Sequence, residues 1–289
     1  MWQMLFSEDI FAYTIPLDDW IDAAVDYLQG HRDVFMAIRQ PVAWLLEGIQ
    51  DFLQWLPPLV LLVLVFVIAW RVATWRLGVF SVVALAFVGF LGLWSEMMTT
   101  LAMVLSSVLF CVLIGMPLGI LASRNDRFAA VLRPVLDIAQ TTPTFVYLIP
   151  VVMLFSIGTV PGVIATIIFA MPPMIRLTEL GIRQVQADAV EAAEAFGSSP
   201  GQILWKVQVP LAMPTIMAGL NQTILLSLSM VVIAAFIGAG GLGKPVFEGL
   251  NALRVGFAGI GGVGIVLLAM VLDRITQALG EPKRRKSST

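Results

Sequence analysis

Charge and reactive side chains are scarce in this sequence. Charged residues make up only 12% of its 289 positions, and a soluble domain normally carries about twice that share. There is one cysteine, Cys111, inside an apolar run, and one histidine, His31, in a polar segment. A disulfide framework and a cysteine metal cluster are therefore excluded. We interpret Cys111 as a packing residue and His31 as a solvated surface residue.

Apolar residues fill most of the chain and predict a membrane protein. They make up 59% of the sequence, and a helix needs roughly 20 of them in succession to cross the hydrocarbon core. The runs that qualify cover 57–73, 77–94, 98–122, 137–157, 160–176, 213–238 and 255–279. We therefore expect an all-α polytopic membrane protein of about seven spans. The fourth and fifth are separated only by Gly158-Thr159, which predicts a tight helical hairpin.

The first 56 residues differ in character from the rest. Acidic and bulky side chains alternate there, without the basic segment and small-residue cleavage site of a signal peptide. We predict one or two amphipathic helices that lie on the membrane surface or against the bundle, the alternative being an ordinary packed helix at the bundle edge. The expected layout is this N-terminal region over 1–56, two peripheral spans over 57–94, a core over 95–279, and a basic tail over 280–289.

Lysine and arginine are divided unequally between the two sides of these spans. Thirteen of the 17 lie on one set of connections, which includes the cluster Lys283–Lys286. The opposite side keeps only Arg32, Arg39, Lys244 and Arg254. Because connections rich in Lys and Arg stay in the cytoplasm, we expect the N-terminus outside and the C-terminus inside the cell.

The same rule places a long polar connection, residues 177–212, in the cytoplasm. Asp188 is the expected cap of a helix over 189–196, rich in alanine, which Gly197 would end. Helix signals in a polar connection are typical of a surface that a second protein contacts. The alternative is a solvated connector.

A second helix is expected within this connection. Ser199 and Pro200 form the combination of a capping residue and a proline at the first helical position. The helix would run to about Val207, and Pro210 and Pro214 would break the chain where it re-enters the membrane.

The spacing in this connection resembles the EAA loop of ABC importer permeases. That pattern is E-A-A, three residues, G, nine residues and I-x-L-P, and the chain follows it from Glu191 to Pro210 with valine at 207 and 209. The resemblance implies that the first helix docks into a cleft of a separate ATPase subunit. The coupling residues it implies are Glu191, Ala192, Ala193, Glu194, Phe196, Gly197 and Pro210.

Further segments resemble one branch of these permeases, the glycine betaine/proline betaine family. They are Gln140–Leu148, Phe169–Arg176, Glu194–Gly197, Leu228–Ala234 and Gly241–Gly243. The branch implies a type I ABC importer transmembrane fold in the bacterial inner membrane and import of glycine betaine, proline betaine or choline. It also implies a homodimer that works with two cytoplasmic ATPase subunits, an extracytoplasmic substrate-binding protein and membrane lipid, without nucleic acid.

Nucleotide binding by this chain itself is not expected. Gly238–Lys244 fits the start of a Walker A loop, but Pro245 occupies the position where Ser or Thr must hold magnesium. We interpret this segment as a flexible extracytoplasmic turn. The chain is therefore predicted to be a non-catalytic subunit without its own cofactor, ATP and magnesium being bound by the partner ATPase.

Other functions remain as alternatives. The first is a permease for methionine or another small solute. A secondary carrier commonly needs a carboxylate in mid-membrane, whereas Asp137 and Asp273 lie near the cytoplasmic ends of their spans. A channel or a structural scaffold leaves the polar connection unexplained.

Several residues within the spans are candidates for a translocation path or gate. They are Gln140, Thr141, Thr142, Pro143, Phe145, Tyr147, Pro172, Asn221, Gln222 and Ser229. Hydrogen bonding between helices is the alternative for the polar members. Phe145, Tyr147 and Phe155 offer rings for a quaternary ammonium cage, the alternative being packing. The residues expected to bend or break the fourth and fifth helices are Pro143, Pro150, Pro172 and Pro173.

Overall fold

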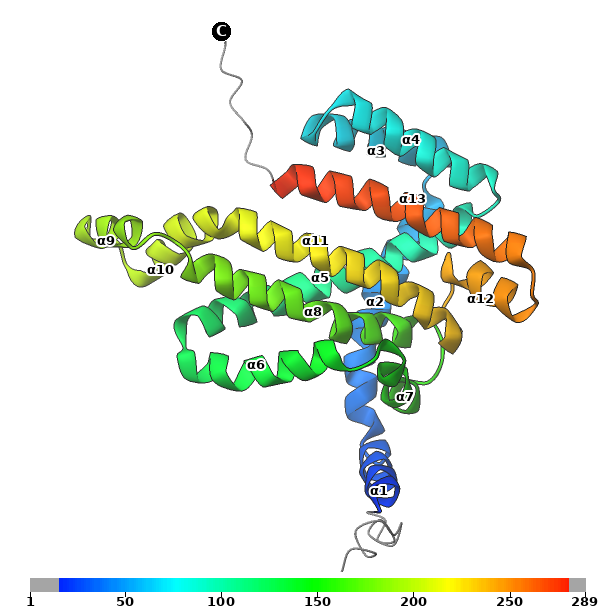
Figure 1. The fold of residues 1–289 in the computed structure, drawn as a ribbon, viewed down its shortest axis with the longest axis horizontal. Helices are drawn as coiled ribbons and strands as arrows, with labels where there is room; N and C mark the ends of the chain where they lie inside the picture. The colour runs from blue at the N-terminus through cyan, green and yellow to red at the C-terminus, as the bar shows by residue number, and fades with distance from the viewer. Residues whose placement is uncertain (1–15, 281–289) are drawn as a thin grey trace, which may run out of the picture.

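The computed structural model describes residues 16–280, which form helices joined by short turns (Figure 1). Within that range no β-strand occurs, in agreement with the predicted all-α membrane protein. The α-helices are α1 (Leu17–Gln29), α2 (Arg32–Trp55), α3 (Pro58–Val72), α4 (Trp75–Phe90), α5 (Trp94–Arg124), α6 (Asp126–Thr141), α7 (Thr144–Phe155), α8 (Thr159–Arg183), α9 (Ala187–Ala195), α10 (Pro200–Ile203), α11 (Val209–Ala234), α12 (Gly243–Asn251) and α13 (Val255–Gly280). A π-helix, η3 (Leu204–Gln208), precedes α11, and a 3-10 helix, η4 (Ala235–Ile237), follows it.

The long helices α5, α8, α11 and α13 lie side by side and form the bundle (Figure 1). α8 packs against both α5 and α11, and α13 packs against α11. Glycine permits this close approach. A Cβ atom at Gly119 of α5 would lie 2.6 Å from the backbone oxygen of Ile175, and one at Gly219 of α11 would lie 3.0 Å from the Cβ of Leu177. Larger residues at either position would therefore force the helices apart.

Four helices are each long and apolar enough to cross a membrane, namely α5, α8, the continuous helix Pro200–Ile237, and α13. The count rises to 6 if each of two bent helix pairs forms one span, α2 with α3 at 105° and α6 with α7 at 101°. α4 is a shorter apolar helix. The figure of about seven spans, which counts α4 as well, therefore stays a prediction.

The predicted fourth span, residues 137–157, is broken at Pro143, one of the prolines expected to bend or break it. This segment is divided between α6 and α7, which meet at an angle of 101°. Pro143 explains the break, because a proline disfavours helical geometry in the residue before it. Thr142 is accordingly extended, with φ −68° and ψ 127°. The break expected at Pro143 is thereby confirmed.

The other prolines of this region leave their helices unbroken. α7 continues through Pro150, and α8 continues through Pro172 and Pro173. The hairpin predicted at Gly158-Thr159 is confirmed, since α7 and α8 pack against each other across a three-residue turn, 156–158. Gly158 has a φ of +127° there, and its N–H donates to the carbonyl oxygen of Ile237 at 2.9 Å.

α1 and α2 are the helices of the N-terminal region. α2 runs across α5 and α8 and contributes Val42, Leu46 and Leu53 to the buried core (Figure 1). α1 contacts α7 and leaves Trp20 and Tyr27 exposed. α2 is therefore packed against the bundle, and a position of these helices on the membrane surface stays a prediction. The basic cluster of the predicted tail, 280–289, lies outside the described residues.

Candidate coupling site

The EAA segment forms a separate short helix, α9, at the end of the bundle opposite to α12 (Figure 1). The predicted cap is wrong by two residues. Gln186 occupies the capping position, and Asp188 lies in the first turn, where its negative charge complements the helix dipole. The shift follows from Ala187, which already has helical geometry and so moves the start of the helix upstream.

Gly197 ends this helix as the sequence predicts. Its φ is +77°, a left-handed conformation that glycine adopts without steric cost. The N–H of Gly197 donates to the Glu194 carbonyl at 2.8 Å, and the N–H of Ser198 donates to the Ala193 carbonyl at 3.1 Å. These bonds satisfy carbonyls that would otherwise lack partners at the helix end. The turn after α9 is therefore tightly defined.

α9 has no buried residue. Glu191 and Glu194 are exposed, and Phe196 is 91% exposed. Burial of a phenylalanine side chain is worth about 2 kcal/mol, and nothing in the bundle provides that burial for Phe196. An acidic, alanine-rich helix that ends in an exposed aromatic ring suits a protein–protein contact.

The second helix of the connection begins as predicted. Ser199 and Gln202 form a capping box, in which the Gln202 N–H donates to Ser199 Oγ at 3.4 Å and the Ser199 N–H donates to Gln202 Oε1 at 2.9 Å. Each side chain thus satisfies a backbone donor of the other residue. This cap fixes the direction in which the chain leaves α9.

The break predicted at Pro210 and Pro214 is wrong. The chain continues without interruption from α10 through η3 into α11, as one helix over Pro200–Ile237. Pro210 removes a helical N–H, and its ring crowds the carbonyl one turn earlier. The π-helical turn η3 ends two residues before Pro210 and is wider than an α-turn, so it accommodates the proline without ending the helix.

Two arginines at the ends of bundle helices form long-range hydrogen bonds around this connection. Arg124 at the end of α5 donates from Nη2 to the Pro200 carbonyl at 3.0 Å. Arg183 at the end of α8 donates from Nη2 to the Ala122 carbonyl at 2.7 Å. Both bonds join residues more than 60 positions apart, so no local pattern signals them.

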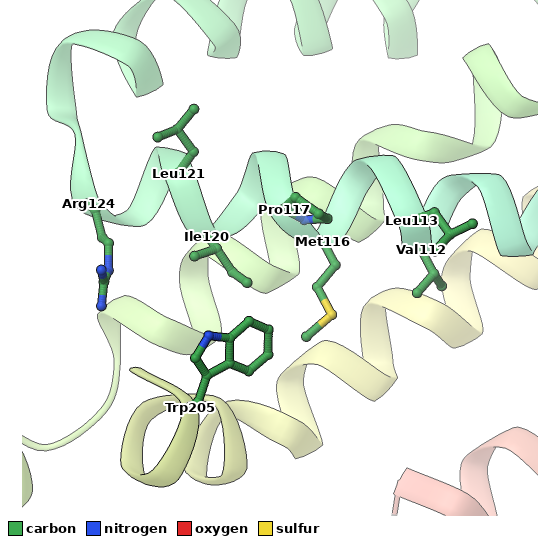
Figure 2. Close-up of a pocket in the computed structure, with 8 residues that line it drawn as sticks. All are labelled: Val112, Leu113, Met116, Pro117, Ile120, Leu121, Arg124 and Trp205. Atoms are coloured by element: carbon green, nitrogen blue, oxygen red, sulfur yellow. The ribbon is translucent and has the colours of Figure 1, made fainter. Parts of the chain in front are cut away.

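An apolar groove of about 500 Å³ lies beside this connection. Figure 2 shows Trp205 of η3 beneath the C-terminal half of α5, with Met116 and Ile120 above it. Arg124 closes one end of the groove. Trp205 is exposed, and η3, the element that carries it, contacts α9.

The candidate path residues around the α6–α7 bend mostly bond within their own segment. Thr141 donates to the Asp137 carbonyl at 2.9 Å, and Thr142 donates to the Ile138 carbonyl at 2.7 Å. Tyr147 of α7 donates its hydroxyl to the Ala139 carbonyl of α6, which closes the bend. Gln140 and Pro143 are exposed.

The other candidate path residues are Pro172 on α8 and Asn221, Gln222 and Ser229 on α11. Pro172 is buried within α8. Asn221 joins α11 to α13, since its Nδ2 donates to Asp273 at 2.9 Å and its Oδ1 accepts from Thr276 at 2.7 Å. Asn221 thus forms hydrogen bonds between helices, which is the alternative to a place on a translocation path. Gln222 and Ser229 are exposed along α11.

The three rings considered for a cation cage do not line one cavity. Tyr147 and Phe155 line an apolar cavity of about 660 Å³ between α2, α5, α7 and α8. The Phe145 ring instead packs edge-on against Phe236, with centroids 5.3 Å apart. Among residues 16–280, no three His, Cys, Asp or Glu side chains are grouped as metal ligands.

The Walker-like segment, Gly238–Lys244, is buried in its middle and exposed at its two ends. The N–H of Leu242 donates to the hydroxyl of Thr100 on α5 at 2.7 Å, and Ala239 and Leu242 are buried. Pro245 lies inside α12. The segment is therefore a packed connection between α11 and α12 rather than the flexible turn that its glycines suggested.

Comparison with known proteins settles the family. The family described as "binding-protein-dependent transport system inner membrane component" matches residues 115–286, which include α9, its capped turn and α11. The chain belongs to this family. The permease is 54% identical over 275 residues to the glycine betaine/proline betaine transport system permease protein ProW of Escherichia coli (strain K12), with 95% of this chain and 78% of ProW covered.

Two further relatives agree with this family. The glycine betaine transport system permease protein OpuAB of Bacillus subtilis (strain 168) is 44% identical over 275 residues, covering 95% of this chain and 98% of OpuAB. A structure of the inward-facing MetNI methionine ABC transporter matches with a TM-score of 0.53 and 26% identity, over 63% of this chain and 89% of that chain. The predicted type I ABC importer fold is thereby confirmed.

Proposed function

We propose that this permease is the membrane-spanning subunit of an ATP-driven importer of quaternary ammonium solutes such as glycine betaine, proline betaine or choline. The relatives ProW and OpuAB, named for betaine transport, support this substrate class. The proposed assembly is a homodimer with two cytoplasmic ATPase subunits and an extracytoplasmic substrate-binding protein. ATP and magnesium bind to the ATPase subunits, and this subunit transmits their motion.

The observation that carries the proposal is the geometry of α9. It is a capped helix without buried residues, it extends beyond the bundle, and it carries the exposed Glu191 and Phe196. These properties suit a helix that docks into a cleft of an ATPase. Closure of the two ATPase subunits would draw the two α9 helices together. The attached bundles would then tilt from the inward-facing to the outward-facing state and accept solute from the binding protein.

The test is transport by the reconstituted complex. The permease is placed in liposomes with its ATPase and binding protein, and uptake of labelled glycine betaine is measured with ATP, without ATP, and with an ion gradient alone. Uptake is expected only with ATP, and labelled methionine serves as the control solute. Uptake driven by the gradient without ATP contradicts the proposal, and transport of methionine in place of betaine contradicts the substrate class.

Two variants address the docking role within the same assay. Glu191→Lys reverses a charge on the exposed face of α9, and Gly197→Asp places a side chain at a φ of +77°. Neither residue is buried, so membrane insertion and capture of solute by the binding protein are expected to remain normal. Both variants should abolish uptake. Transport at the wild-type rate in both would refute docking through α9.

A further inference from the structure

α6 lies between the coupling site and the bend at Thr142-Pro143, and three ion pairs join it to the cytoplasmic half of α8. Asp126 pairs with Arg183 at 2.8 Å, Arg133 with Glu179 at 2.9 Å, and Asp137 with Arg176 at 2.5 Å. The partners run in opposite directions along the two helices. Together these six residues form what we call the α6–α8 ladder.

Apolar packing does little to hold α6 in place. Only Ala129 and Leu136 are buried on this helix, whereas Val131, Val135 and Ile138 are exposed. The ladder is therefore the main specific attachment of α6 to α8. Exposed ion pairs add little to overall stability, but each pair fixes the separation of the two helices at one point along their length.

The middle of the ladder is its strongest point. Glu179 is buried and accepts from two arginines, Arg133 at 2.9 Å and Arg183 at 3.1 Å. A buried carboxylate that loses a cationic partner is strongly destabilised, because it cannot regain its hydration. Sliding of α6 along α8 would remove such a partner, so the two helices are held in one register.

The ends of the ladder meet the two functional features of this region. At one end, Arg183 is the last residue of α8, and α9 begins at Ala187. At the other end, the Asp137–Arg176 pair lies one helical turn before the end of α6 at Thr141, where the chain bends by 101° into α7. The ladder thus spans from the residue that precedes the connection to α9 to the last turn of α6 before the bend.

We propose that the α6–α8 ladder makes α6 move as one body with the cytoplasmic half of α8, so that motion of α9 reaches the bend at Thr142-Pro143 and repositions α7. The six ladder residues are positioning residues, which act through the helices that they join. This inference rests on the proposed function, because it assigns the route by which the ATPase cycle reaches the membrane-embedded part of the permease.

The Asp137–Arg176 pair offers the sharpest test, because each partner has one ionic contact among residues 16–280. In the liposome assay, uptake and ATP hydrolysis are measured together, and their ratio reports coupling. Asp137→Arg and Arg176→Asp should each lower the betaine transported per ATP hydrolysed by about tenfold. The double swap restores the pair in reverse and should return the ratio to the wild-type value. Arg127→Gln is the matched control, because Arg127 is exposed on α6 and makes no ion pair in the described part of the chain.

Each outcome of the swap experiment decides between a coupling and a structural role. A reduced ratio in the single variants that the swap restores supports the ladder. Wild-type ratios in both single variants overturn it, and so does a loss that the double swap leaves uncorrected. The wild-type complex tests the proposed function separately. If it shows no ATP-dependent betaine uptake, the proposed substrate and function are contradicted. The proposal about the ladder is then tested by spin-label distances within the permease.

The distance measurement requires no transported solute. Spin labels are placed in pairs at the exposed positions Val131 on α6, Leu180 on α8 and Ile149 on α7, with Cys111 replaced by serine and labelled permease diluted with unlabelled permease. Between the nucleotide-free and ATP-bound complex, the 131–180 distance should stay constant and the 131–149 distance should change. A change in the 131–180 distance as large as that in the 131–149 distance overturns the inference.

Discussion

Phe196 and Gly197 show how single residues define the coupling site. Gly197 adopts the left-handed conformation that ends α9, and the preceding ring of Phe196 is left 91% exposed. An aromatic ring in water loses the free energy that its burial would provide, about 2 kcal/mol. Its exposed position suits the proposed contact with the ATPase subunit.

Replacement of Phe196 by alanine should weaken binding of the ATPase subunit. Loss of a buried aromatic anchor is expected to cost about 2 kcal/mol, or about 30-fold in Kd. The thermal stability of the permease should not change, because the ring has no packing partner within the chain. Affinity is measured by titration of the ATPase against permease in nanodiscs. Leu250→Ala, an exposed apolar position on α12 at the other end of the bundle, is the control. Equal affinities for both variants would contradict a role of Phe196 in docking.

At the scale of elements, one proline turns an apolar run into two helices. The segment 137–157 reads as a span by composition, yet Pro143 holds Thr142 extended and separates α6 from α7. Pro150, only seven positions later, lies inside α7 without ending it. The difference is one of position in the helix. Pro143 lies just before the first residue of α7, where its missing N–H costs no helical hydrogen bond, whereas Pro150 is held in line by the contacts of α7 with α8.

Replacement of Pro143 by alanine should reduce the bend. Alanine has the highest helix propensity and proline the lowest, a difference of about 3 kcal/mol within a helix. Helical geometry is thus expected to extend across Thr142, and spin labels at Val131 and Ile149 should report a longer and more narrowly distributed distance. Betaine uptake should fall while ATP hydrolysis persists. Pro150→Ala is the matched control, since α7 does not depend on that proline for its direction. An unchanged distance in Pro143→Ala would show that packing, not the proline, holds the bend.

At the scale of the whole molecule, the two ends of the bundle carry different chemistry. α9 and α10 lie at one end, and α12 lies at the other (Figure 1). Basic residues lie next to α9 and α10: Arg183 ends α8, Lys206 lies in η3, and Arg124 ends α5 and donates to Pro200. This distribution supports the proposed orientation, in which α9 lies in the cytoplasm and the C-terminus shares that side.

Reporter fusions check this orientation. Alkaline phosphatase inserted after Ala252, between α12 and α13, should be active, because it folds only outside the cytoplasm. The same enzyme fused after Thr289 should be inactive, and a green fluorescent protein fused there should fluoresce. We expect this pattern because 13 of the 17 Lys and Arg lie on the connections that are predicted to be cytoplasmic. The opposite pattern would invert the topology and would place α9 out of reach of any cytoplasmic ATPase.

Many features of this protein depend on residues close together in the sequence and can be predicted from it. Apolar runs predict membrane helices. The helix start predicted at Ser199-Pro200 and the helix end predicted at Gly197 are both confirmed. These features depend on residues within one helical turn of each other. The EAA spacing likewise lies within a single connection, and it led to the family that the comparisons establish. The error at Asp188 is of the same local kind, a boundary displaced by two residues.

The remaining features depend on which helices become neighbours. The ladder joins residues 39 to 57 positions apart, and the bond from Arg124 to Pro200 joins residues 76 positions apart. An arginine at the end of an apolar run looks the same in sequence whether it faces water, lipid or a buried Glu179. The π-turn that carries the chain past Pro210 is similarly held within a packed helix. Hydrophobicity and capping are properties of a segment and were predictable, whereas the partners of charged groups follow from packing and became visible only with the fold.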